Sequence, residues 1–257
     1  MIIQSQVWKA LQKFGWAKAN TVRHGGGALR RYQKWAGLKV DGKAGPVTRH
    51  SLSTPRLCGT PDQIARGQCK WPMKSVSWSI KDSLPGVPDA AYKEAAHWAT
   101  RQWNEACGVK LQYKQNHRTA NVWMTVKNLG GPGGVLADSQ LPCGATATSQ
   151  MIQRYDSSEL WFAELGQPPQ GRISLPTVCV HELGHAIGIS HLPPNGQPAI
   201  MQPFYNPSML SLLGPDIEEA RDRYGSSDIN PPPSAGGYWV TVRIQTDTEP
   251  TTERIAG

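Results

Sequence analysis

The feature that most constrains this chain is a short histidine-rich run, HELGHAIGISH, at residues 181–191. His181 and His185 are four positions apart, so on a helix both imidazoles lie on one face and can bind one metal ion. Gly188 tolerates a positive φ, which lets the helix end and the chain turn back towards His191 as a third ligand. Three protein ligands leave one coordination position open, as catalytic zinc requires.

Glu182 follows the first ligand directly but is not placed to bind the ion itself. Its carboxylate can reach a water molecule at the open position and act as general base. An ordinary amphipathic helix with solvated histidines, or a structural zinc, would leave this glutamate and the open position without a purpose. The motif therefore predicts one catalytic Zn²⁺ held by His181, His185 and His191, with Glu182 as the catalytic residue.

Met201 stands ten residues after His191, in the run AIMQPFY. Here the sequence resembles the metzincins, in which HExxHxxGxxH is followed by a methionine turn beneath the metal. Within that clan it resembles the matrixins, or matrix metalloproteinases, over roughly residues 28–225. The supporting segments are KWPMKSVSWSI, the helix at 88–107, GGVLADS, YDSSELW (155–161) and PDIEEARDRYG (215–225).

The resemblance implies an α+β metzincin catalytic domain, a twisted mixed sheet with an active-site helix and a C-terminal helix, preceded by a small all-α domain. It also implies how a peptide would bind. The substrate would lie extended along Gly134, Val135, Leu136 and Ala137 as an added strand at the sheet edge. A wall for the residue after the scissile bond would be formed by Pro203, Phe204 and Tyr205.

Hydrophobic periodicity independently predicts the elements that carry these motifs. Alternating residues indicate strands at 75–80, 109–113 and 122–126. An i, i+3, i+4, i+7 stripe that includes Tyr92, Ala99 and Trp103 predicts a long helix opening at Pro88 and Asp89. Further helices are expected around 177–188 and 215–224, with a linker at 230–237, an edge strand at 238–246 and a tail of low order beyond it.

The run PRLCGTPD (55–62) resembles the matrixin cysteine-switch motif PRCGxPD. A thiolate is a good zinc ligand, so Cys58 would take the open position and keep the enzyme latent. Leu57 is an extra residue relative to the family, and it can shift the ion pair of Arg56 and Asp62 that braces the loop. With Cys58 assigned, the other four cysteines can pair; they are Cys69, Cys107, Cys143 and Cys179.

The N-terminal part of the chain differs in charge from the rest. Residues 1–69 carry 12 Lys and Arg against 2 Asp and Glu, whereas residues 70–257 carry 15 against 17. Residues 1–52 read as short helices, the last of them capped by Thr48. The run GLKVDGKAGPVTRHSL resembles a peptidoglycan-binding-like module, which would bind cell-wall polymer, fold the propeptide over the cleft, or serve only as a spacer.

These features divide the chain into four parts: 1–54, a helical propeptide module; 55–69, the switch and activation linker; 70–225, the catalytic domain; and 226–257, a Pro-rich linker and tail. Two family features are missing. No histidine lies between 118 and 180, and Asp138 and Arg154 stand where ligands of a second, structural zinc would be, so that zinc is expected to be absent. Asp156 and Glu159 match calcium ligands, but too few oxygen ligands accompany them for tight Ca²⁺ binding.

We interpret the sequence as a zinc metalloendopeptidase, made as a latent zymogen, that hydrolyses proteins or peptides. The alternatives are a zinc hydrolase targeted to peptidoglycan through residues 1–54 and a non-catalytic wall-binding protein. An extracellular monomer with no membrane or nucleic-acid partner is expected, although no signal peptide is visible and no run approaches the roughly 18 apolar residues of a membrane span.

Overall fold

The computed structural model describes residues 2–18, 26–54, 56, 58–62, 69–194 and 196–227. Within these ranges the buried apolar side chains form two separate clusters, one in the N-terminal helices and one around the sheet. The predicted linker at 230–237, strand at 238–246 and tail beyond it lie outside the described residues, as do Pro55, Leu57 and residues 63–68 of the predicted linker at 55–69.

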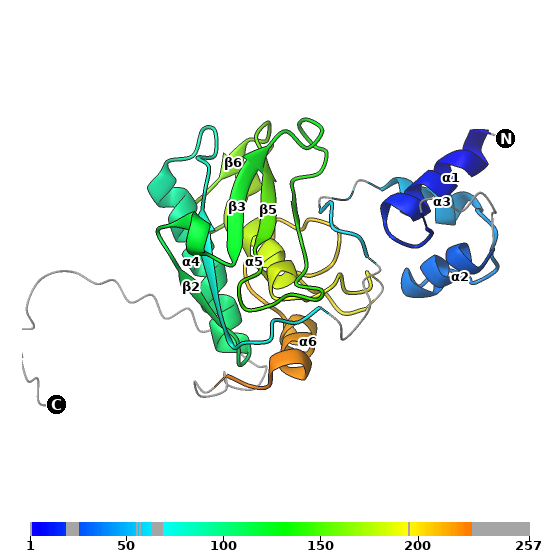
Figure 1. Ribbon diagram of the computed structural model, residues 1–257. Helices are drawn as coiled ribbons and strands as arrows, with labels where there is room; N and C mark the ends of the chain where they lie inside the picture. The colour runs from blue at the N-terminus through cyan, green and yellow to red at the C-terminus, as the bar shows by residue number, and fades with distance from the viewer. Residues whose placement is uncertain are drawn as a thin grey trace, which may run out of the picture.

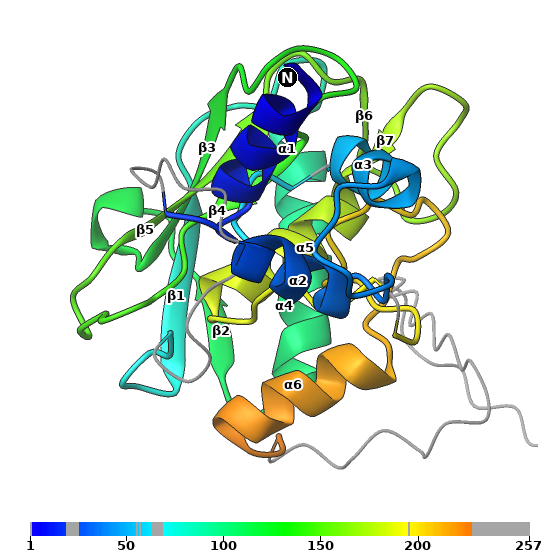
Figure 2. The ribbon, with the colours of Figure 1, turned by 90° about the vertical axis from the view of Figure 1, so that its right-hand side faces the viewer.

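Three helices make up the N-terminal part: α1 (Ile2–Lys13), α2 (Gly26–Trp35) and α3 (Pro46–Ser53). Figure 1 shows them as a group to one side of the sheet, and in Figure 2 they lie on the side nearest the viewer, with α2 in front of α5. Apolar residues from all three helices and the turn after α1 form their core: Val7, Leu11, Phe14, Trp16, Ala28, Leu29, Tyr32 and Leu52.

The prediction that Thr48 caps the third helix is wrong. The helix begins at Pro46 after an extended Gly45, and no side chain caps it. Proline suits this first position because its missing N–H would have no helical partner there. Thr48 is instead buried inside the helix, where its hydroxyl accepts a 3.2 Å hydrogen bond from the Gln33 amide.

A five-stranded sheet with the order β2-β1-β3-β5-β4 forms the frame of the larger part. Its strands are β1 (Ser75–Ile80), β2 (Lys110–Tyr113), β3 (Val122–Lys127), β4 (Ala137–Ser139) and β5 (Met151–Asp156). All neighbours are parallel except β4, which runs antiparallel to β5 and lies at the edge. The three strands expected from alternation are confirmed to within one residue at each end.

Helices α4 (Asp89–Ala106) and α5 (Leu175–Ala186) pack against each other and against this sheet, and α6 (Gly214–Tyr224) closes the fold (Figure 1). The predicted α4 stripe is confirmed, because its apolar residues are buried. Smaller elements are the 3₁₀ helix η1 (His117–Thr119) and the parallel pair β6 (Trp161–Phe162) and β7 (Ile173–Ser174). None of the described helices has the length and apolar character of a membrane span.

The cysteines pair only in part as expected. Cys69 and Cys143 form a disulfide, whereas Cys107 and Cys179 are free and fully buried. Cys107 follows α4 and points its sulfur at the Trp103 carbonyl, and Cys179 lies on α5. Both therefore act as small apolar core residues, and the expectation that these two also form disulfides is wrong.

Candidate metal centre

Helix α5 carries the first two histidines and is buried along its whole length. The Ser174 hydroxyl accepts a 3.3 Å hydrogen bond from the Thr177 amide at its start, and Pro176 occupies the first turn. The uniformly apolar sequence LPTVCV suits a helix enclosed by α4 and the sheet. Because α5 is buried on all sides, its position in the fold is fixed. The face of the helix that carries His181 and His185 is therefore fixed as well.

The turn after α5 depends on Gly188. Its φ is +93°, and a Cβ built there would lie 1.9 Å from the Cys69 carbonyl oxygen. Both the backbone conformation and the close approach therefore require glycine. The chain then returns so that His191 faces the helix, as the sequence predicts.

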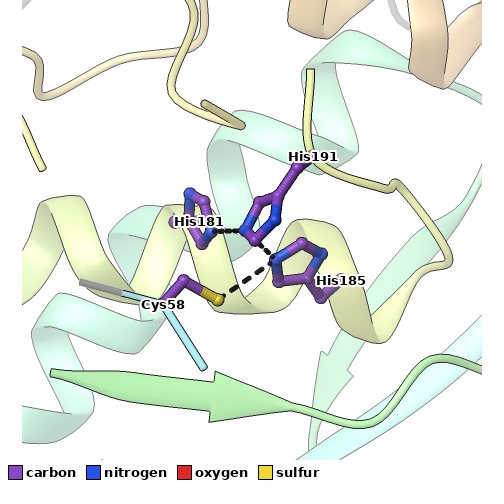
Figure 3. A group of neighbouring side chains, drawn as sticks. All are labelled: Cys58, His181, His185 and His191. Carbon is purple, nitrogen blue, oxygen red and sulfur yellow. Dashed lines mark hydrogen bonds between the residues drawn. The ribbon is translucent and has the colours of Figure 1, made fainter. Parts of the chain in front are cut away.

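The three imidazoles converge on one point (Figure 3). The Nε2 atom of His191 lies 3.3 Å from that of His181 and 3.1 Å from that of His185. Burial lowers the pKa of His181 to about 3 and also lowers the pKa of His185 and of His191. The rings are therefore neutral at pH 7, and each carries one N–H.

The position of that N–H follows from what each Nδ1 atom faces. The Nδ1 of His181 donates to the Ile200 carbonyl at 2.7 Å, and that of His185 donates to the Ile189 carbonyl at 2.7 Å. The Nδ1 of His191 lies 3.0 Å from a carboxylate oxygen of Asp62. All three partners are acceptors, so all three Nε2 atoms present lone pairs to one another.

Three lone pairs at this separation repel one another unless a cation lies between them. A tetrahedral zinc ion bound at about 2.0–2.1 Å places its nitrogen ligands roughly 3.3 Å apart, which matches the Nε2 spacing. The Cys58 sulfur lies 3.4 Å from the Nε2 of His185, and all four ligand atoms lie within 4.8 Å of one another. The residues therefore fit a zinc ion with three nitrogen ligands and one sulfur ligand.

Glu182 is nearly inaccessible, with 1% of its surface exposed, and its Oε2 atom has no partner among the described residues. Burial and the charge of Asp138 raise its pKa well above the usual value, although Cys58 acts in the opposite direction. The Cys58 thiol is also buried, and burial and Glu182 raise its pKa well above the usual value. A bound cation is therefore needed to hold Cys58 as a thiolate.

The matrixin family matches residues 70–225 of this chain. The chain is a matrixin. Matrix metalloproteinase-16 of Homo sapiens is 28% identical over 89% of this chain and 42% of its own length. Metalloendoproteinase 1 of Glycine max is 28% identical over 79% of this chain and 73% of its own length, and neutrophil collagenase of Homo sapiens is 27% identical over 77% and 43%. The present chain thus spans under half the length of matrix metalloproteinase-16.

Met201 of this matrixin lies in a turn and is fully buried, and its sulfur packs against Gly184 of α5, the residue before His185. Asp216, at the start of α6, holds this turn: its carboxylate accepts hydrogen bonds of 2.9 Å from the Ile200 amide and 3.0 Å from the Met201 amide. The Ile200 carbonyl accepts the hydrogen bond from His181 Nδ1. Asp216 therefore positions the first ligand indirectly, by holding Ile200. The sequence predictions do not include Asp216. The sequence feature that could have indicated it is an acidic residue in the first turn of a helix that begins at Gly214.

The predicted substrate residues fall into two groups. Strand β4 begins only at Ala137, so Gly134, Val135 and Leu136 precede the strand rather than form it. Leu136 nevertheless lines a cavity beside His181 and Glu182, together with Pro203, Phe204 and Tyr205. The Tyr205 hydroxyl accepts a 2.8 Å hydrogen bond from the Ser174 amide, which fixes this wall to the start of α5.

Residues 58–60, part of the run predicted to be a cysteine switch, lie at the edge of the sheet. Cys58 forms a parallel bridge with Ala137, and the Gly59 amide donates to the Ala137 carbonyl at 2.9 Å. The Thr60 hydroxyl donates to the Ser139 carbonyl at 3.1 Å. Residues 58–60 thus occupy backbone groups of β4 that an extended peptide at this edge would use.

The ion pair expected between Arg56 and Asp62 forms despite the extra Leu57. Arg56 donates to a carboxylate oxygen of Asp62, and both side chains are buried. The guanidinium also lies 3.7 Å from the centre of the Phe14 ring and 5.8 Å from that of Phe204. Arg56 therefore connects the N-terminal helices to Phe204, which lines the cavity beside His181 and Glu182.

At the positions expected to replace the second zinc, Arg154 and Asp138 form a two-pronged ion pair with distances of 2.7 Å and 2.6 Å. The carboxylates matched to calcium ligands receive protein donors: Asp156 accepts from the Leu129 and Ser158 amides, and Glu159 accepts from the Gly133 amide at 2.7 Å. Within the described residues, Cys58, His181, His185 and His191 form the one group of three or more His, Cys, Asp or Glu side chains placed closely enough to hold a metal ion.

Proposed function

We propose that this matrixin is a zinc-dependent endopeptidase, made as a latent zymogen, that hydrolyses peptide bonds of proteins. One observation carries the proposal: the Nε2 atoms of His181 and His185 lie 3.3 Å and 3.1 Å from that of His191, beside the Cys58 sulfur and a buried Glu182 oxygen that has no partner among the described residues. Such a set has three permanent nitrogen ligands, one replaceable ligand and a base. That combination is the requirement for hydrolysis rather than for a structural site.

A zinc ion in this site supplies Lewis-acid polarisation of a carbonyl and lowers the pKa of water. The protein's own residues do the rest. Glu182, held inside by α5, takes a proton from the attacking water and delivers it to the leaving amine. Its raised pKa suits a group that must both accept and return a proton. Met201 and Asp216 keep the ligands in place.

Substrate recognition would use the surfaces that now face the propeptide. Backbone groups of Ala137 would pair with an extended peptide, and residues 134–136 would flank it. The cavity wall at 203–205 would accept an apolar side chain after the scissile bond, because Leu136 and Phe204 line the same space.

Latency would come from Cys58 in the replaceable position. Activation would need a cut between about Asp62 and Trp71, a stretch of which residues 63–68 lie outside the described ones. We assign residues 1–54 to the helical propeptide module, 55–69 to the switch and linker, 70–225 to the catalytic domain, and 226–257 to the tail. The molecule would act outside the cell as a monomer.

The test is to load the full chain with Zn²⁺, nick it with trypsin, and follow casein or gelatin hydrolysis together with bound metal. We expect one zinc per chain, no hydrolysis before nicking, hydrolysis afterwards, and loss of both metal and activity with a chelator. A chain that binds no zinc, or a zinc-loaded nicked chain that leaves both proteins intact, would contradict the proposal.

The basic N-terminal part favours a second candidate, a hydrolase directed to cell-wall polymer. Residues 1–69 carry 12 basic side chains against 2 acidic ones, a charge that suits an anionic polymer. Incubating the nicked enzyme with purified sacculi separates the two functions. Release of wall peptides without hydrolysis of casein or gelatin would support this candidate over the first.

A further inference from the structure

The three metal-ligating histidines differ in where their orienting partners come from. His181 and His185 donate their Nδ1 protons to backbone carbonyls of the catalytic domain itself, those of Ile200 and Ile189. His191 faces Asp62, which lies on the N-terminal side of the proposed activation cut. One of the three ligands is therefore oriented by a side chain that activation would remove.

Asp62 is held in this position by the N-terminal helical part. Its Oδ2 atom accepts a 2.7 Å hydrogen bond from the Trp16 indole, and its amide donates to the Phe14 carbonyl at 3.1 Å. Its Oδ1 atom accepts from Arg56 and lies 3.0 Å from the Nδ1 of His191. The carboxylate exposes almost no surface, so water does not compete for it.

A carboxylate on the distal nitrogen of a metal-bound imidazole fixes the ring and raises its basicity. Loss of such a partner typically weakens metal binding about 10- to 100-fold. A backbone carbonyl orients a ring in the same way but brings no full negative charge. Asp62 therefore offers His191 the strongest of the three orienting contacts.

We propose that Asp62 is a positioning residue for the metal ligand His191, supplied by the propeptide, so that the latent chain holds zinc more tightly than the activated one. The inference rests on the zinc site of the proposed function. It gives the propeptide a second role besides blocking the site with Cys58: it secures the metal until activation. Contacts from Trp16 to Asp62 and from Asp62 to His191 then connect the N-terminal helices to the metal site.

A simpler role for Asp62 would be to brace the Cys58 loop through Arg56. The two roles can be distinguished in a variant that lacks Cys58, because bracing the Cys58 loop then no longer affects a metal ligand. We therefore compare full-length Cys58→Ala with Cys58→Ala/Asp62→Asn, and measure the Zn²⁺ dissociation constant by competition with a chromophoric chelator. A direct role predicts about 10-fold or greater weakening in the double variant. Equal affinities would overturn the proposal.

A matched control loosens the same segment without touching His191. Thr60→Val in the Cys58→Ala background removes the bond to the Ser139 carbonyl and keeps the side chain's shape. We expect its zinc affinity to equal that of Cys58→Ala. A loss as large as that caused by Asp62→Asn would show that segment docking alone matters, and would refute the role assigned to Asp62.

Trp16→Phe tests the same series of contacts at the Trp16–Asp62 hydrogen bond. It also provides a test if Asp62→Asn fails to fold. It removes the indole donor to Asp62 and keeps an aromatic ring in the helical core. The Nδ1–H resonance of His191, followed by NMR in ¹⁵N-histidine-labelled protein, should exchange faster with solvent in either variant. Unchanged exchange and unchanged zinc affinity in Trp16→Phe would contradict the proposal.

The outcomes also separate this inference from the proposed function. If the wild-type chain binds no zinc, the proposed function fails. If every variant binds one zinc with the same affinity and the nicked wild type hydrolyses protein, only the role of Asp62 fails.

Discussion

Gly184 on α5 lies directly against Met201: a Cβ built on Gly184 would be 2.4 Å from the Met201 sulfur and 2.6 Å from the Trp103 ring. The position lies one residue before the second histidine, so the metal-binding helix touches the methionine turn and α4 at the same point. Packing at this point leaves no space for even one methyl group. The contact links the stability of the fold to the position of the ligands.

We predict that Gly184→Ala destabilises the protein although alanine favours helix. Overpacking should cost about 1–3 kcal/mol in the free energy of unfolding, which exceeds the gain of roughly 1 kcal/mol in helix propensity. Urea denaturation measures the difference. Gly214→Ala, at the start of α6 where a Cβ would meet nothing within 4 Å, is the control and should change stability little. A stabilised Gly184→Ala variant would contradict the packing argument.

Glu182→Gln should separate metal binding from turnover. Glutamine keeps the shape of the side chain but cannot accept the proton from water, so zinc content should stay at one ion per chain. Hydrolysis by the nicked enzyme should fall by about 10²–10⁴-fold or more. Metal analysis and casein hydrolysis on the same sample check both. Substantial remaining proteolysis would show that another group acts as the base.

Cys58→Ala should relieve latency in the uncut chain. Without the sulfur, water can enter the fourth position while Arg56 and Asp62 still hold the segment on the sheet edge. We expect slow hydrolysis of a short peptide by uncut Cys58→Ala and none by the uncut wild type. If both remain silent and nicking activates both equally, then the block is steric and Cys58 is not its cause.

Much of the catalytic domain could be predicted from the sequence because its signals are local. The α4 stripe and the three alternating strands follow from periodicity, and the ligand set follows from the spacing of His181, His185 and His191 on a helix and a turn. The resemblance to matrixins supplied the edge strand and the switch, and its residues Gly134–Leu136 proved to precede the strand.

The supporting contacts of the metal site and the cysteine pairing depend on segments that are distant in the sequence. The spacing of residues along the chain does not predict such contacts. Asp62 meets His191 across 129 positions, and Asp216 supports the turn of Met201 from a later helix. The pairing of Cys69 with Cys143, and the burial of Cys107 and Cys179 apart from them, likewise follow from the packed core. Cysteine counting limits such pairings but does not choose among them.

Acid should destabilise the chain once it has been stripped of metal. The buried imidazoles have folded-state pKa values below the usual 6.5, about 3 for His181, so the unfolded chain binds more protons between these values. Stability is therefore fully present above pH 6.5 and is lost as pH falls towards 3. Each neutral imidazole contributes a slope of about 1.4 kcal/mol per pH unit.

Urea denaturation of the stripped chain at pH 7 and pH 5 measures this dependence. His181→Gln should reduce the slope between these values. Equal free energies of unfolding at pH 7 and pH 5 would contradict neutral burial of the imidazoles.

The Cys69–Cys143 disulfide should matter both before and after activation. It closes a loop across a sequence separation of 74, and the Cys69 carbonyl packs against Gly188 while accepting a 2.8 Å hydrogen bond from Arg223. Replacing both cysteines by serine should cost about 2–4 kcal/mol in the free energy of unfolding. A phosphine reductant should destabilise the wild type by a similar amount and leave the double variant unchanged.

The same bond determines how the chain separates when it is nicked. A cut before Cys69 leaves both cysteines on the C-terminal product, so the N-terminal product can leave and Cys58 with it. A cut between Cys69 and Trp71 leaves the two parts joined, and the propeptide stays at the site until the bond is reduced. Non-reducing gels of the nicked chain, compared with reduced ones, distinguish the two. We expect activity without reductant only from the first kind of cut; activity from a product whose parts remain joined would show that Cys58 leaves the metal without release of the propeptide.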